Sequence, residues 1–130
     1  MKRIKLLAQR YLKARKFGLF YFGARNFEVP NKIKLDNKII NLYLPNEYGI
    51  KISFIEIFLD DVYQLGFIKK LMKKKQVKVN SILDIGGNCG LTSLLSRAYF
   101  PNSIINCYEP NPDLKKFLEN NSKIGNFNYF

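Results

Sequence analysis

The chain has 130 residues, with 22 Lys and Arg against 10 Asp and Glu, and its formal net charge is +12. Hydrophobic residues make up 47 % of it, too many for a disordered chain, and the length allows one domain, or a domain with an appendage, but not two full cores. The charge is uneven, because residues 1–80 hold 18 basic and 6 acidic side chains, whereas residues 81–130 hold 4 of each. The excess positive charge therefore belongs to the first part of the chain.

Several classes of protein are excluded by what the sequence lacks. It has no His and only two cysteines, Cys89 and Cys107, so a zinc site or a Cys–His nucleophile has too few ligands and no base, and we expect no metal. Two cysteines form no disulfide framework, which favours a reducing, cytoplasmic location. No run of 18 apolar residues is present, so the sequence predicts no membrane-spanning segment.

Residues 1–53 form a basic N-terminal region that begins with a predicted amphipathic helix over residues 2–17. Ile4, Leu7 and Tyr11 recur near a period of 3.6, with Lys and Arg between them. Three interpretations stay open for this helix: it packs on the core, it attaches residues 1–22 peripherally to an anionic membrane, or it binds nucleic acid. The case for nucleic acid is not strong.

The middle of the chain predicts a β-hairpin followed by a helix. Residues 32–35 and 38–44 are apolar-rich runs separated by the turn-prone pair Asp36-Asn37, whereas residues 53–58 suit a strand or a helix equally. The carboxylates of Asp60-Asp61 favour a helix start there. The expected apolar stripe of that helix comprises Val62, Leu65, Ile68, Leu71 and Met72, and the lysine cluster that follows is interpreted as a solvated helix end.

The last fifty residues alternate strands and helices. Residues 81–85 form a short apolar run typical of a buried parallel strand, and residues 104–108 form a second apolar strand. Residues 91–99 between them have the spacing of an amphipathic helix. A second helix is predicted from Pro112, with Asn111 as its N-cap, to Gly125, and a third strand begins at Phe127. This order predicts an α/β fold with a Rossmann-like, doubly wound parallel sheet.

A glycine-rich loop joins the first of these strands to its helix. Asp84 ends the strand, Gly86, Gly87, Asn88 and Gly90 follow, and Glu109 lies at the end of the next strand. Loops at the carboxyl edge of a doubly wound sheet are where ligands bind. The glycines permit positive φ angles and close approach of a ligand, and a carboxylate such as Glu109 can accept both hydrogen bonds of a ribose diol.

The spacing of the glycines does not fit a dinucleotide site. The G-x-G-x-x-G pattern, started at Gly86, needs glycine at the positions of Asn88 and Leu91. The anionic side chain of Asp84 would also repel a pyrophosphate, but it suits a ligand with ammonium and sulfonium groups. The loop therefore favours S-adenosylmethionine over NAD, and the alternative is a tight turn from strand to helix with no ligand.

Two motifs in order carry a resemblance to a known family. Asp84–Gly90 fits D-x-G-A/G-N-x-G and Tyr108–Asn111 reads Tyr-Glu-Pro-Asn, and over residues 54–130 the chain resembles the N-terminal portion of FkbM-family, S-adenosylmethionine-dependent methyltransferases of class I. The resemblance implies that the four loop residues line the methionine end of the cofactor. It implies that Asp84 holds the loop or the amino group, Glu109 the ribose hydroxyls, and Asn111 the ribose or adenine edge.

The resemblance also sets what we expect of function. It implies O-methylation of a small-molecule acceptor, a sugar, a glycan precursor or another small biosynthetic hydroxyl compound. The family's sheet has seven strands, so we expect residues 54–130 to be the first half of that domain, cut off after its second helix, with the catalytic residues beyond residue 130. The chain would then be a fragment, a truncated reading frame or part of a split assembly. The alternative function is a non-catalytic basic module that binds an anionic membrane surface or nucleic acid.

Overall fold

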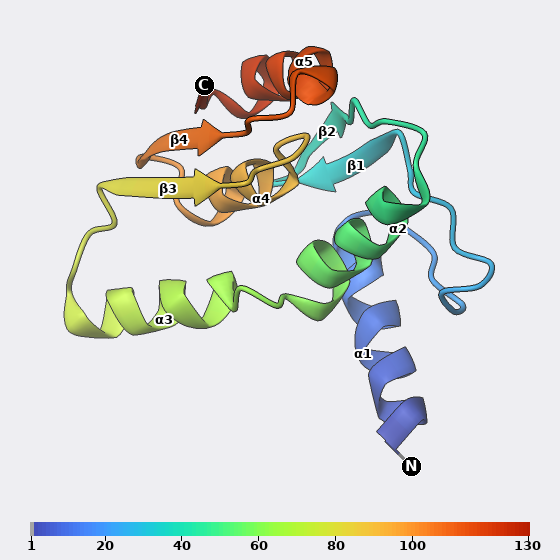
Figure 1. Ribbon diagram of the computed structural model, residues 1–130. Helices are drawn as coiled ribbons and strands as arrows, with labels where there is room; N and C mark the ends of the chain where they lie inside the picture. Colours follow the sequence, from blue (N-terminus) through green and yellow to red (C-terminus); the bar gives the residue numbers. More distant parts are fainter. Residues whose placement is uncertain (1) are drawn as a thin grey trace.

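The computed structural model describes residues 2–130 (Figure 1). Its first part contains helices and one hairpin joined by loops, and in chain order these are α1 (Lys2–Lys16), β1 (Lys32–Leu35), β2 (Lys38–Asn41), α2 (Tyr48–Phe54), the π-helix η1 (Ile55–Asp60) and α3 (Leu65–Lys75). Its second part alternates strands and helices: β3 (Ser81–Ile85), α4 (Leu91–Tyr99), β4 (Ile104–Tyr108), the 3₁₀ helix η2 (Pro112–Leu114), α5 (Lys115–Gly125) and β5 (Asn128–Tyr129).

The second part is a three-stranded parallel sheet with two crossover helices. The strand order is β3-β4-β5, and the register places Asp84 opposite Cys107 and Cys107 opposite Tyr129. Helix α4 packs against β3 and β4, and α5 packs against α4 and β5. The mixed α/β architecture with a parallel sheet is therefore confirmed, and it is compatible with a Rossmann-like arrangement.

Only one face of this sheet is covered. Ile105 and Cys107 lie beneath the helices, at 1 % and 0 % exposure, whereas apolar side chains of the opposite face remain in contact with solvent. The large exposed side chains of that face are Leu83, Ile85, Ile104, Tyr108 and Phe130. The prediction of strands buried on both faces is wrong for β3, because its side chains alternate between a half-buried and an exposed face.

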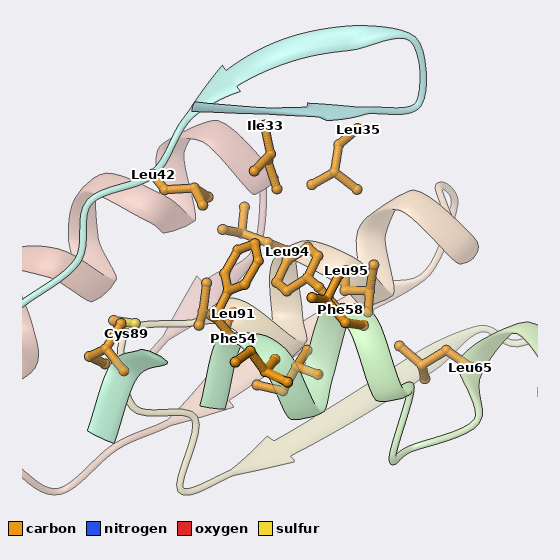
Figure 2. Close-up of a cluster of buried hydrophobic side chains, with 14 of the residues drawn as sticks. Ile33, Leu35, Leu42, Phe54, Phe58, Leu65, Cys89, Leu91, Leu94 and Leu95 are labelled. Carbon is orange, nitrogen blue, oxygen red and sulfur yellow. The ribbon is translucent and has the colours of Figure 1, made fainter. Parts of the chain in front are cut away.

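The hydrophobic core lies between the hairpin, the α2–η1 helix and α4 (Figure 2). Strand β1 contributes Ile33 and Leu35, and α4 contributes Leu94. On α2–η1, the rings of Phe54 and Phe58 stack with their centroids 4.6 Å apart. The regions expected as residues 1–53 and 54–130 thus share one core, and residue 53 lies inside α2.

The structure forms the predicted hairpin and decides the conformation of the segment from Ser53 to Phe58. Asp36 and Asn37 both have positive φ angles, 47° and 63°, as a two-residue type I′ turn requires. The segment from Ser53 to Phe58, which the sequence left open, is helical throughout.

The prediction that Asp60-Asp61 begins a helix is wrong. Asp60 ends η1 and Asp61 takes a left-handed conformation, while α3 begins at Leu65, whose backbone amide donates to Asp61 Oδ1 at 3.0 Å. Because Val62 precedes α3 and is 50 % exposed, it is not part of the predicted apolar stripe. The carboxylate of Asp61 still acts at the start of α3, but from the preceding turn.

The N-terminal helix is attached to the rest of the chain near its middle. Arg10 donates to both carboxylate oxygens of Asp60, at 2.7 and 2.6 Å, and to Tyr21 Oη at 3.0 Å. Within residues 2–130, no helix combines the length and apolar character that crossing a bilayer would need.

Candidate functional site

The predicted site residues meet at the carboxyl edge of the parallel sheet. The loop Gly86–Gly90 leaves β3 where Glu109 leaves β4, and the register that pairs Ile85 with Tyr108 makes Gly86 and Glu109 neighbours. Two adjacent parallel strands therefore bring a glycine-rich turn and a carboxylate together, as the order of the motifs in the sequence predicts.

Glu109 fixes the loop by accepting two backbone hydrogen bonds. Its Oε2 accepts from the amide of Asn88 at 2.8 Å, and its Oε1 accepts from the amide of Asn111 at 2.9 Å. Each carboxylate oxygen has a further lone pair. Both oxygens are therefore held in place and can still accept a hydrogen bond from a ligand.

The backbone amides of the loop are all engaged within the chain. Those of Gly86 and Gly87 donate to Tyr108 O at 2.8 and 3.1 Å, that of Cys89 donates to Asn88 Oδ1 at 2.7 Å, and that of Gly90 donates to Gly87 O at 2.8 Å. With the Asn88 amide on Glu109, residues 86–90 keep no backbone donor for a bound anion. The loop therefore offers acceptors, whereas a pyrophosphate needs donors.

The three glycines are required for different reasons. Gly86 has φ +73°, and no atom lies within 4 Å of the place where a Cβ would stand, so its surroundings are open. At Gly87 a Cβ would collide with Cys107 Sγ. Gly90 has φ +84°, and a Cβ at this position would lie 2.7 Å from Phe127. The glycine therefore permits close packing of the loop against the α5–β5 segment, and not against β3, the strand that precedes the loop.

Asp84 points to the covered side of the sheet. Its Oδ2 accepts from Ser93 Oγ at 2.6 Å and from Cys107 Sγ at 3.7 Å. Ser93 lies in the first turn of α4 and is 0 % exposed. The carboxylate therefore joins β3 to α4 and to β4 beneath the loop.

Asn111 acts as an N-cap, as predicted. Its Oδ1 accepts from the amide of Asp113 at 3.0 Å and begins η2. A small cavity of about 160 Å³ opens beside it, between the ends of β4 and β5. The cavity is lined by Glu109, Asn111, Pro112, Lys115, Leu118, Tyr129 and Phe130.

The two cysteines, Cys89 within the loop and Cys107 on β4, are buried, uncharged side chains. Both are 0 % exposed. Burial raises the pKa of each thiol, from an ordinary value of 9.0 to about 12. Neither is activated as a nucleophile, and among residues 2–130 no group of three His, Cys, Asp or Glu side chains is placed to hold a metal ion.

One residue that supports the site was missed by the sequence analysis. Asn121 of α5 is 0 % exposed, and its Nδ2 donates to Cys89 O at 2.7 Å and to Tyr43 O at 2.8 Å. Its Oδ1 accepts from the Tyr43 amide at 3.0 Å. Asn121 therefore joins the loop, α5 and the segment after the hairpin. No local pattern marks it, because its partners lie 32 and 78 residues away.

Comparisons with known proteins give a distant likeness at the level of structure. No family model matches the chain, and no curated protein matches it. Among solved structures, it is similar to coclaurine N-methyltransferase bound to N-methylheliamine and SAH, with 16 % sequence identity and a TM-score of 0.38. The alignment covers 98 % of this chain and 37 % of that one, so the chain spans little more than a third of that protein's length.

Proposed function

We propose that the loop Gly86–Gly90 and Glu109 bind S-adenosylmethionine, and that the chain is part of an FkbM-like methyltransferase. The observation that carries this proposal is the use of every backbone amide of the loop within the chain. A loop without free backbone donors lacks the groups that usually cradle a phosphate. It suits a ligand that brings its own donors, such as an ammonium group and the two hydroxyls of a ribose.

Glu109 is the residue that we propose for the ribose. The amides of Asn88 and Asn111 hold one oxygen each, so the carboxylate needs no reorganisation to accept a diol. A receptor group that is already oriented costs little entropy on binding. This fixed geometry supports the proposed role.

The space around the loop is compatible with such a ligand. Gly86 has open surroundings, which allow the methionine end to approach the backbone, and the cavity beside Asn111 is adjacent to Glu109, where the base would follow the ribose. We assign the adenine edge to this cavity, next to the side-chain amide of Asn111.

The chemistry proposed is methyl transfer to oxygen. S-adenosylmethionine bound at this loop would supply an electrophilic methyl carbon attached to a sulfonium. In-line attack by a hydroxyl of the acceptor would form the C–O bond as the S–CH3 bond breaks, with release of S-adenosylhomocysteine and of the hydroxyl proton. The residues described here orient the cofactor, which is the main contribution that such a displacement needs from a protein. The acceptor that we propose, a sugar, a glycan precursor or another small biosynthetic hydroxyl compound, follows from the resemblance of Asp84–Gly90 and Tyr108–Asn111.

Calorimetric titration with S-adenosylhomocysteine, the demethylated product, tests the proposal. We expect saturable binding to the full chain, abolished by Gly86→Asp, which fills the approach with a charge, and by Glu109→Ala. Glu119→Ala is the matched control, because this exposed carboxylate lies on α5 and pairs only with Lys123 at 2.9 Å. The proposal would be overturned if the parent chain did not bind S-adenosylhomocysteine, if all three variants lost the same affinity, or if NAD bound more tightly.

A further inference from the structure

The surface in question is formed by the outer side of α1 and by the turn that follows it. The exposed apolar side chains that define it are Ile4 at 73 %, Leu12 at 62 %, Phe20 at 75 % and Phe22 at 76 %. Figure 1 shows the N-terminal turns of α1 extending away from the sheet and from the core. We call these four side chains, with Tyr11 between them, the N-terminal surface.

The aromatic side chains of this surface are held outward by their neighbours. Tyr21 is 1 % exposed, because it packs against Phe27 at 5.3 Å and accepts a hydrogen bond from Arg10. Exposure alternates along this segment, so anchoring Tyr21 leaves Phe20 and Phe22 on the solvent side. Their rings lie parallel, with centroids 6.5 Å apart.

The aromatic pair continues onto the helix. Phe22 lies 6.2 Å from the ring of Tyr11, which is on the same side of α1 as Ile4 and adjacent to Leu12. The contact between Tyr11 and Phe22 therefore joins the aromatic pair of the turn to α1, the helix that also carries the exposed side chains of Ile4 and Leu12.

The charge around the surface has a single sign. Residues 1–27 contain eight Lys and Arg and no Asp or Glu. Among the side chains that the structure describes, Arg10 and Lys13 of this group form salt bridges, with Asp60 and Asp61. Lys5, Arg15 and Lys16 are exposed and flank the apolar side chains.

We propose that the N-terminal surface docks the protein on an anionic lipid bilayer. Apolar and aromatic side chains that project from a basic helix enter the boundary between headgroups and acyl chains, while Lys and Arg contact the anionic headgroups. Nucleic acid would use the charge but would leave exposed apolar side chains such as Ile4 and Leu12 in water. The exposed face of the sheet is less suited to this partner, because β3, β4 and β5 contain no Lys or Arg.

The test is flotation of the full chain with phosphatidylcholine vesicles, with and without phosphatidylserine. We expect binding only with phosphatidylserine, and release at about 1 M salt, where the Debye length is ~3 Å. Phe20→Ala/Phe22→Ala and Lys5→Glu/Lys16→Glu should each weaken binding by about tenfold or more. Both pairs are exposed, so circular dichroism should show an unchanged fold.

The controls lie on α3, which is basic too. Phe67 is 61 % exposed there, and Lys74 and Lys75 are exposed at its end. Phe67→Ala and Lys74→Glu/Lys75→Glu should change vesicle binding less than about threefold. If the α3 variants lost as much vesicle binding as the variants of the N-terminal surface, the attraction would come from net charge alone, and the proposal would be overturned.

Two further outcomes would contradict it. Tighter binding to an oligonucleotide than to the vesicles, insensitive to Phe20→Ala/Phe22→Ala, would assign the surface to nucleic acid. Dimerisation in sedimentation experiments, lost with the same double variant, would assign it to a second copy of the chain. The result is independent of the proposed methyltransferase function, because the N-terminal surface contains none of the residues of the glycine loop.

Discussion

Glu109 Oε2 accepts a hydrogen bond from the backbone amide of Asn88, at 2.8 Å, and so the end of β4 holds the loop that follows β3. The second oxygen accepts from the amide of Asn111 in the same way. One carboxylate thus fixes both segments of the candidate site before any ligand binds.

This relationship predicts the effect of Glu109→Gln. The side-chain amide keeps the size of the carboxylate but replaces one acceptor with a donor, which would face a backbone N–H. Hydrogen bonds to charged groups contribute ~1.5–3 kcal/mol. We therefore expect the affinity for S-adenosylhomocysteine, measured by calorimetry, to fall by about tenfold or more. Glu119→Gln is the matched control, and an affinity that is the same in both variants would contradict the role of Glu109.

Gly86 and Gly87 should respond differently to alanine. Gly86→Ala places a methyl group in open space, so folding should lose only about 1 kcal/mol, the cost of a positive φ, while ligand affinity falls. Gly87→Ala drives a methyl group into Cys107 Sγ, and overpacking of this kind costs ~1–3 kcal/mol or more. Urea unfolding beside ligand titration separates the two effects. Equal destabilisation by both substitutions would show that the loop geometry is wrong.

Asn121→Ala tests the link between the loop and the N-terminal region. It removes three hydrogen bonds at a fully buried position and leaves groups of Tyr43 and Cys89 without partners. We expect a loss of ~2–4 kcal/mol in the free energy of unfolding, since each unsatisfied buried group costs ~1–3 kcal/mol. Asn120→Ala is the control, because that exposed neighbour bonds only within its own helix, to Lys116 O. A loss below about 1 kcal/mol for Asn121→Ala would refute the link.

The buried thiols predict a dependence of stability on alkaline pH. Burial raises the pKa of Cys89 and of Cys107 to about 12, from an ordinary value of 9.0. The folded chain therefore holds these protons where the unfolded chain releases them, so their contribution is complete below about pH 9 and is lost as the pH rises toward 12.

Urea midpoints measured across this pH range check the prediction. Tyrosines also ionise there, so the informative comparison is the slope in Cys89→Ala and in Cys107→Ala. Each variant should start less stable, because it leaves a small cavity, but should lose less stability per pH unit than the parent chain. Identical slopes in all three proteins would assign the whole effect to other groups.

The alternation of strands and helices after residue 81 could be predicted because the signals are local. Each apolar run there is short, and Asn111 with Pro112 marks a helix start by its own chemistry. The two neighbours Gly86 and Glu109 could be placed together by topology alone, since parallel strands end at the same edge. The expected roles of Asp84, Glu109 and Asn111 toward a cofactor stay predictions.

The remaining features depend on contacts that no local pattern contains. Asp61 accepts a hydrogen bond from the amide of Leu65 but lies outside α3. The prediction from the carboxylate pair therefore placed the start of this helix four residues too early. Ile85 is as apolar as a core residue but is 78 % exposed, because exposure depends on whether anything covers that face of the sheet. In the sequence, Asn121 is an ordinary polar residue of a predicted helix. Its role depends on Tyr43 and Cys89, which only the folded chain brings next to it.

The central claim is that the acceptor-rich loop after β3 binds S-adenosylmethionine, and amide chemical-shift mapping tests it most directly. On titration of the ¹⁵N-labelled chain with S-adenosylhomocysteine, we expect saturable shifts at Gly86, Asn88, Gly90, Glu109 and Asn111, with the amides of α3 unchanged. Shifts that are absent, or that cluster away from the carboxyl edge of the sheet, would contradict the claim.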